Sequence, residues 1–144
     1  MGHALAPEIA ATDYHTAGEP FRIVTAGVPP IPGATVRERR EHAAASEAID
    51  LVRRLLCHEP RGHADMYGCF LVPPDDEGAD FGVLFWHKDG YSTACGHGTI
   101  ALGVWAVATT LPDGTSITTS GPAARSDYTA HTPSAIVPCP HAVE

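Results

Sequence analysis

Basic side chains are scarce in this chain. Its 144 residues carry 9 Lys and Arg against 17 Asp and Glu, a formal net charge of −8 at pH 7. Nucleic-acid surfaces need clustered cations, so this balance excludes such a partner. Long apolar runs are also missing. The longest, Ile100 to Ala108, is interrupted by Gly103 and is far too short to cross a bilayer. We therefore expect neither a nucleic-acid nor a membrane partner.

Cysteine is limited to four residues, and no two of them have the C-x-x-C spacing of a zinc or redox site. They are Cys57, Cys69, Cys95 and Cys139. The first residues lack a basic region and a long apolar core, so we expect no secretory signal and reduced thiols in the cytoplasm. Nine histidines are present without an H-E-x-x-H or paired Cys/His pattern, which predicts no metal site.

A single long helix is predicted from Thr35 to about Leu56. Thr35 followed by Glu38 is a capping-box pattern, and apolar side chains then recur along one stripe. The stripe consists of Ala45, Ile49, Val52 and Leu56. Charged residues cover the other face, so the arginines of this helix are interpreted as solvated surface. They are Arg37, Arg39, Arg40, Arg53 and Arg54.

The length predicts one domain with a real core. Residues 12–20 form a polar, turn-rich stretch, and residues 21–25 alternate like a short strand. Residues 65–72 and 81–87 are predicted as two further strands. The second is apolar on both faces and is therefore expected at the centre of a sheet.

Residues 97–109 are predicted as a helix that is apolar nearly all round. Such a helix needs partners on every side. We therefore expect an α+β fold in which strands enclose one buried helix. Beyond it, residues 109–144 keep neither a helical nor a strand period, and Thr, Ser, Pro and Gly make up about half of them. They are predicted to form an irregular tail.

Cys95 lies where a turn leads into that apolar helix. Unpaired N–H groups and the positive end of the helix dipole favour the thiolate, which can act as base or nucleophile. The same N–H groups, with Gly96 allowing close approach, can hold a carboxylate. His97 in the first turn either contacts a ligand through its ring or only caps the helix. The simpler alternative for Cys95 is an inert core thiol, the role also expected of Cys57 and Cys69.

Three segments together resemble the N-terminal half of the proline racemase family. They are HTAGEPFRIV at 15–24, EPRGHADMYG at 59–68 and GYSTACGHGTIA at 90–101. The resemblance covers residues 12–108, leaving 1–11 as an N-terminal extension and 109–144 as a tail of truncated or out-of-frame origin. It implies a diaminopimelate-epimerase-like lobe, with mixed β-structure wrapped around a buried central helix and the second lobe missing.

The resemblance also implies a chemistry. Cys95 removes or returns the α-proton of proline or a hydroxyproline, and the backbone amides of Gly96 and His97 hold the carboxylate, with no cofactor and no metal. A second lobe supplies a Cys or a Thr for the opposite face, and no matching segment occurs in this chain. The residues around Cys95 favour trans-3-hydroxy-L-proline dehydratase, with proline racemase and 4-hydroxyproline 2-epimerase as alternatives.

Two other classes of function stay open from the sequence. One is a catalytically incomplete fragment that acts only by association, for instance as a homodimer through an exposed cleft wall. The other is a thiol-redox domain built on Cys95 without a resolving partner.

Overall fold

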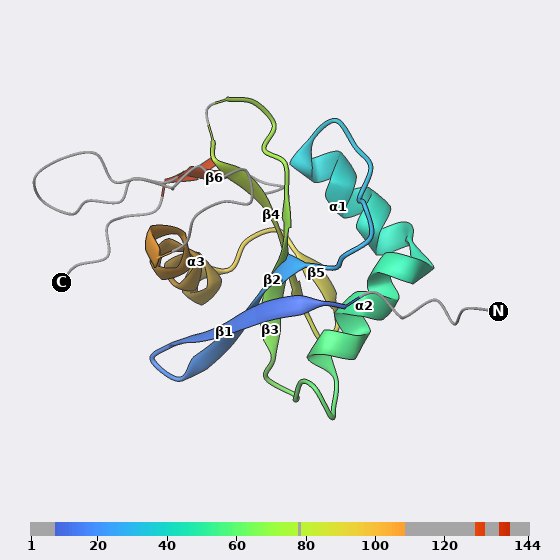
Figure 1. Cartoon of the computed structure of the whole chain (residues 1–144), viewed down its shortest axis with the longest axis vertical. Helices are drawn as coiled ribbons and strands as arrows, with labels where there is room; N and C mark the ends of the chain where they lie inside the picture. The colour runs from blue at the N-terminus through green and yellow to red at the C-terminus, as the bar shows by residue number, and fades with distance from the viewer. Residues whose placement is uncertain (1–7, 78, 109–128, 132–135, 139–144) are drawn as a thin grey trace, which may run out of the picture.

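The strands of the computed structural model form one mixed sheet with helices on both faces (Figure 1). The structure describes residues 8–77, 79–108, 129–131 and 136–138. The elements of this part are β1 (Ala10–Thr16), β2 (Glu19–Ala26), α1 (Val36–Ala45), α2 (Glu47–Cys57), β3 (Tyr67–Val72), β4 (Phe81–His87), β5 (Gly90–Ser92), α3 (Gly96–Ala108), β6 (Thr129–His131) and β7 (Ile136–Pro138). This arrangement confirms the predicted α+β class.

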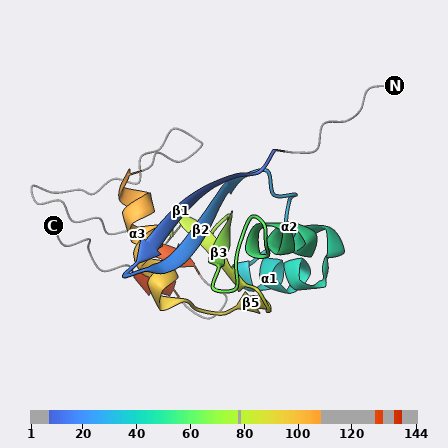
Figure 2. The same cartoon turned by 90° about the horizontal axis from the view of Figure 1, so that it is seen from below.

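The sheet order is β1-β2-β3-β4-β6-β7, with β5 also paired to β4. Side chains that alternate along β3 and β4 enter two separate cores, because successive strand residues point to opposite faces. Cys69 and Phe85 face α3, whereas Phe70 and Trp86 face α1 and α2. Figure 2 shows these helices on opposite sides of the sheet. Residues 81–86 are all buried, which confirms β4 as a central strand.

The stretch 12–20, predicted as turn-rich, instead contains most of β1. This strand pairs antiparallel with β2 and places Tyr14 opposite Phe21. The turn between the strands is made by Ala17 and Gly18, whose φ angles are 50° and 90°. β1 is an edge strand and largely exposed, so it lacks the apolar alternation that identifies a half-buried strand.

The single helix predicted over 35–56 is wrong, because the chain breaks at Ser46 into α1 and α2. Ser46 has an extended backbone, with φ −92° and ψ 115°, and its hydroxyl accepts a hydrogen bond from the N–H of Ile49 at 3.4 Å. It therefore ends one helix and caps the next. The predicted start is confirmed, since the Thr35 hydroxyl accepts from the N–H of Glu38 at 3.1 Å.

Arg53 is buried, contrary to the expectation that the helix arginines are solvated. Its Nε donates to an Asp50 carboxylate oxygen at 2.6 Å. Its Nη1 donates to the backbone carbonyls of His87 at 2.7 Å and Lys88 at 3.1 Å. The guanidinium also lies 5.8 Å from the Tyr91 ring centroid. Helical periodicity predicts which face of the helix carries Arg53. It does not predict the carbonyls of His87 and Lys88, which accept hydrogen bonds from the buried guanidinium.

Helix α3 packs its inner side on β1 and β2. Ala101, Leu102 and Trp105 are buried there, as expected for a core helix. On the outer side Ile100 is 55% exposed and Val104 is 44% exposed. Enclosure of this helix is therefore incomplete within the residues that the structure describes.

The predicted tail over 109–144 lies outside the described residues except for β6 and β7, and so do residues 1–7 of the predicted extension. In the part that is described, none of the helices combines the length and the apolar character that spanning a membrane requires.

Candidate active site

Cys95 occupies the N-cap position of α3. Its backbone carbonyl accepts the first helical hydrogen bond from the N–H of Thr99 at 2.9 Å and a second from the Thr99 hydroxyl at 2.8 Å. The short strand β5 turns back from β4 and leads the chain to this point. The thiol therefore lies beside the N–H groups of the first helical turn, where the sequence placed it.

The Cys95 thiol is nearly enclosed, with the residue 9% exposed at the edge of the core under α3. Burial raises the pKa of this thiol, and a hydrogen bond from the Gly98 N–H lowers it by less. The sequence predicts that the helix N-terminus favours the thiolate. The loss of hydration outweighs that effect on the pKa of Cys95.

His97 is the side chain that contacts this thiol. Its Nδ1 lies 3.5 Å from the Cys95 Sγ, and its Nε2 lies 3.9 Å away. The ring meets Tyr67 edge-on at 4.8 Å between centroids and Phe21 edge-on at 6.0 Å. The Thr16 hydroxyl donates to the His97 carbonyl at 3.0 Å. Side chains from β2 and β3 therefore pack against the imidazole, and one from β1 holds the backbone of His97.

The two glycines that flank His97 differ sharply in their surroundings. A Cβ on Gly96 would meet no atom within 4 Å, so the backbone there is open to a ligand. A Cβ on Gly98 would run into the Phe21 ring, with Cζ at 2.8 Å and Cδ2 at 2.9 Å. Gly98 therefore lets the first turn of α3 press directly on β2, while Gly96 leaves its amide accessible.

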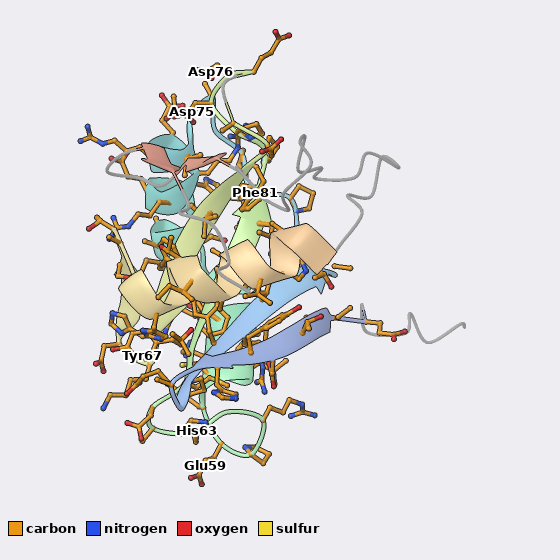
Figure 3. The ribbon with its side chains drawn as sticks, turned by 90° about the vertical axis from the view of Figure 1, so that its left-hand side faces the viewer. Glu59, His63, Tyr67, Asp75, Asp76 and Phe81 are labelled. Atoms are coloured by element: carbon orange, nitrogen blue, oxygen red, sulfur yellow. The ribbon has the colours of Figure 1, made fainter. Side chains whose placement is uncertain are left out.

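Tyr67 and Phe21 are the residues of this site that sequence reasoning missed. Figure 3 shows Tyr67 near the N-terminal end of α3. The two aromatics lie opposite each other on the parallel strands β2 and β3, which is a pairing that no local pattern predicts. The usable signal was their membership of the matched segments 15–24 and 59–68.

Arg61 and His63 belong to the connection between α2 and β3. Figure 3 shows Glu59 and His63 on a loop beyond Tyr67, away from α3. The Arg61 carbonyl accepts a hydrogen bond from the Arg22 guanidinium at 2.7 Å, and the His63 Nδ1 accepts from the Asp65 N–H at 3.2 Å. These contacts hold the loop and take no part in the arrangement around Cys95.

The arrangement places two groups that can exchange a proton beside a helix N-terminus. A thiol and an imidazole lie within 3.5 Å, next to backbone amides at a helix N-terminus. Within the described ranges, no group of three or more His, Cys, Asp or Glu side chains is arranged to hold a metal ion.

Known proteins are similar to this chain in sequence and in fold. A family model described as proline racemase matches residues 11–137. A trans-3-hydroxy-L-proline dehydratase of Bacillus cereus is 57% identical over 90 residues, which are 62% of this chain and 26% of the relative. A 3-hydroxyproline 2-epimerase of Burkholderia multivorans is 54% identical over 99 residues, which are 69% of this chain and 29% of the relative.

A solved structure gives the same result for the fold. The hydroxyproline epimerase of Agrobacterium vitis, with bound trans-4-OH-L-proline, superposes with a TM-score of 0.78 at 23% identity. The likeness covers 90% of this chain and 36% of that one. The chain thus spans between a quarter and a third of the length of the curated relatives. The match of the family model over most of its length shows that the chain belongs to the proline racemase family.

Proposed function

We propose that the chain provides one half of a site for α-proton transfer on proline or a hydroxyproline, with Cys95 as the catalytic acid or base. The observation that carries the proposal is the Cys95 thiol at the N-cap of α3, with the His97 Nδ1 at 3.5 Å and the open Gly96 backbone beside it. Membership of the proline racemase family supports proline or a hydroxyproline as the substrate class.

The proposed steps follow from the positions of these groups. The backbone amides of Gly96 and His97 hold the substrate carboxylate, whose negative charge increases as the α-carbon loses its proton. His97 is placed to accept the proton of the buried thiol, because its Nδ1 is in contact with the sulfur. The Cys95 thiolate then takes the α-proton from one face of the ring.

Trans-3-hydroxy-L-proline is the substrate that we favour, with dehydration as the reaction. Two relatives at 57% and 54% identity are a trans-3-hydroxy-L-proline dehydratase and a 3-hydroxyproline 2-epimerase. In a dehydration, loss of the α-proton is coupled to departure of the 3-hydroxyl as water. The proposed steps use no cofactor. They need Cys95 as a free thiol, and a reducing compartment such as the cytoplasm keeps it so.

Ligand protection of Cys95 tests the carboxylate site without requiring turnover. Pyrrole-2-carboxylate is planar at the α-carbon, like the deprotonated substrate, and should slow alkylation of Cys95 by iodoacetamide. At about ten times its Kd it should slow the reaction roughly tenfold, because only the free form reacts. Pyrrole without a carboxylate is the matched control. Equal protection by both compounds, or by neither, would contradict the proposed role of the amides.

Exchange of the α-proton tests the chemistry itself. We expect trans-3-hydroxy-L-proline in D₂O to exchange its α-proton slowly with the purified chain, since the described residues supply a base to one face only. Cys95→Ser should lower the rate on the order of 100-fold, the usual contribution of a general acid–base group. NMR of the substrate measures the loss of the α-proton signal. Exchange that persists in Cys95→Ser, or none at high protein concentration, would count against the proposal.

A further inference from the structure

Tyr67 belongs to a row of three side chains that crosses the sheet near the start of α3. The strand register places it opposite Phe21 on β2 and opposite His87 on β4. Residues that lie opposite each other on neighbouring strands point to the same face of a sheet. Phe21 belongs to the core under α3, and Tyr67 packs against that core. The row therefore lies on the face of the sheet that α3 covers.

The ring of Tyr67 lies between two imidazoles. It meets the His97 ring edge-on, at 4.8 Å between centroids and 81° between planes. It meets the His87 ring at 5.7 Å. The His87 ring is itself restrained, because its Nδ1 accepts a hydrogen bond from the Asp89 N–H at 3.2 Å. The ring of Tyr67, and not its hydroxyl, makes both contacts.

The imidazole of His97 depends on the strands for its orientation. Its neighbours in the sequence, Gly96 and Gly98, have no side chains to restrict it. Two aromatic rings meet it, and Tyr67 at 4.8 Å is nearer than Phe21 at 6.0 Å. Phe21 is fully buried and also packs against Gly98, so its main role is in the core. Tyr67 is thus the aromatic contact that can act on the imidazole alone.

We propose that Tyr67 is a positioning residue, whose ring keeps the imidazole of His97 in contact with the Cys95 sulfur. Rotation of the imidazole away from the sulfur would break the edge-on contact with Tyr67 as well as the 3.5 Å approach of Nδ1. A proton that passes from the Cys95 Sγ to an unprotonated Nδ1 leaves a thiolate and an imidazolium, which attract each other at this distance. The inference rests on the proposed function, in which His97 accepts that proton.

The ionisable groups around this contact decide what a pH titration reports. Cys95 itself and His97 are in contact on α3. Tyr67 and Cys69 come from β3, and His87 on β4 meets the Tyr67 ring. Burial raises the pKa of Cys69 far above its ordinary value, so this thiol stays neutral near pH 7. Alkylation of Cys95 near neutral pH therefore reports the thiol together with the imidazoles near it.

The rate of Cys95 alkylation by iodoacetamide tests the proposal without substrate. It is followed as a function of pH in the tryptic peptide 89–125, which contains Cys95 and no other cysteine. We expect Tyr67→Leu to react roughly fivefold more slowly at pH 7, the size of one edge-to-face ring contact. The difference should narrow as the pH is raised, because the thiol then ionises without the imidazole. Exposure of the thiol alone would have the opposite effect, since a less buried thiol is more accessible and more acidic.

Three further variants serve as comparisons. Tyr67→Phe keeps the ring and should retain the wild-type rate. Tyr14→Leu makes the same change on β1, against the same core, and should not slow alkylation. His97→Gln should be as slow as Tyr67→Leu, and the double variant no slower, because both changes remove one contact. Tyr67→Met takes the place of Tyr67→Leu if that variant does not fold.

The outcomes separate this inference from the proposed function. Slow alkylation in His97→Gln with an unchanged or faster rate in Tyr67→Leu would overturn the positioning role and leave the proton acceptor in place. Equal slowing in Tyr14→Leu, or slowing that Tyr67→Phe shares, would also overturn the positioning role. An unchanged rate in His97→Gln would contradict the acceptor step itself, and the inference with it.

Discussion

Gly98→Ala is expected to lower the free energy of unfolding by about 2 kcal/mol, the usual size of an overpacking defect in a tight core. The added methyl group would run into the Phe21 ring, which is itself fully buried. Neither side can yield easily, because Phe21 is held on β2 and Gly98 is inside the first turn of α3. The helix start must therefore move away from the sheet.

Gly96→Ala is the matched control for that prediction. It makes the same chemical change two residues earlier in the same turn, where a Cβ meets nothing within 4 Å. We expect no loss of stability, since alanine is the better helix former. Urea unfolding compares the two, and the rate of Cys95 alkylation reports the helix start, rising only in Gly98→Ala. Equal stability of both variants would show that α3 does not rest on Phe21 as described.

Arg53→Met is expected to lower the free energy of unfolding by about 3 kcal/mol, the lower end of the range for breaking a buried ion pair. It removes hydrogen bonds to Asp50 and to the carbonyls of His87 and Lys88. Asp50 keeps its ion pair with Arg54 at 3.2 Å, and the Lys88 carbonyl keeps its contact with the His58 ring at 3.3 Å. Arg37→Met removes the same charge from an exposed pair with Glu41 and should change stability by no more than about 0.5 kcal/mol. Thermal or urea unfolding measures both. Similar losses in the two variants would contradict the anchoring role of Arg53.

The pH dependence of stability is a second test of the contact between Arg53 and Asp50. The hydrogen bond from Arg53 lowers the pKa of Asp50 below its usual 3.8, against the opposing effect of burial. A carboxyl group with a lowered pKa in the folded state contributes stability above its unfolded pKa and loses it as the pH falls through the folded value. Stability of the wild type should therefore fall below about pH 4 more steeply than that of Arg53→Met.

The sequence predicted those parts of the fold that depend on local pattern. The apolar runs gave β4 and α3 with their ends within one residue, because a central strand and a core helix are apolar on nearly every face. The position of Cys95 at the helix start followed from the turn before it and the apolar residues after it. The resemblance of three separated segments then gave the family, which no single segment specifies.

The features that were missed depend on contacts between distant segments. β1 was read as a turn because an exposed edge strand shows no alternation. The inward fold of Arg53 depends on carbonyls some 35 residues later in the chain. The helix start alone predicts a lowered pKa for Cys95, whereas burial in the core between the sheet and α3 raises it. In each case the local pattern does not include the distant residues that decide the burial or the pKa of the group.

The parallel pairing of β2 with β3 has a consequence for how the molecule forms. Residues 27–66, which include α1 and α2, must be gathered before the two strands can meet, and closing so long a connection is entropically unfavourable. Phe21 and Tyr67, whose rings pack against His97, lie on the two strands that this connection joins. We infer that the environment of the thiol is complete only once this crossover has closed.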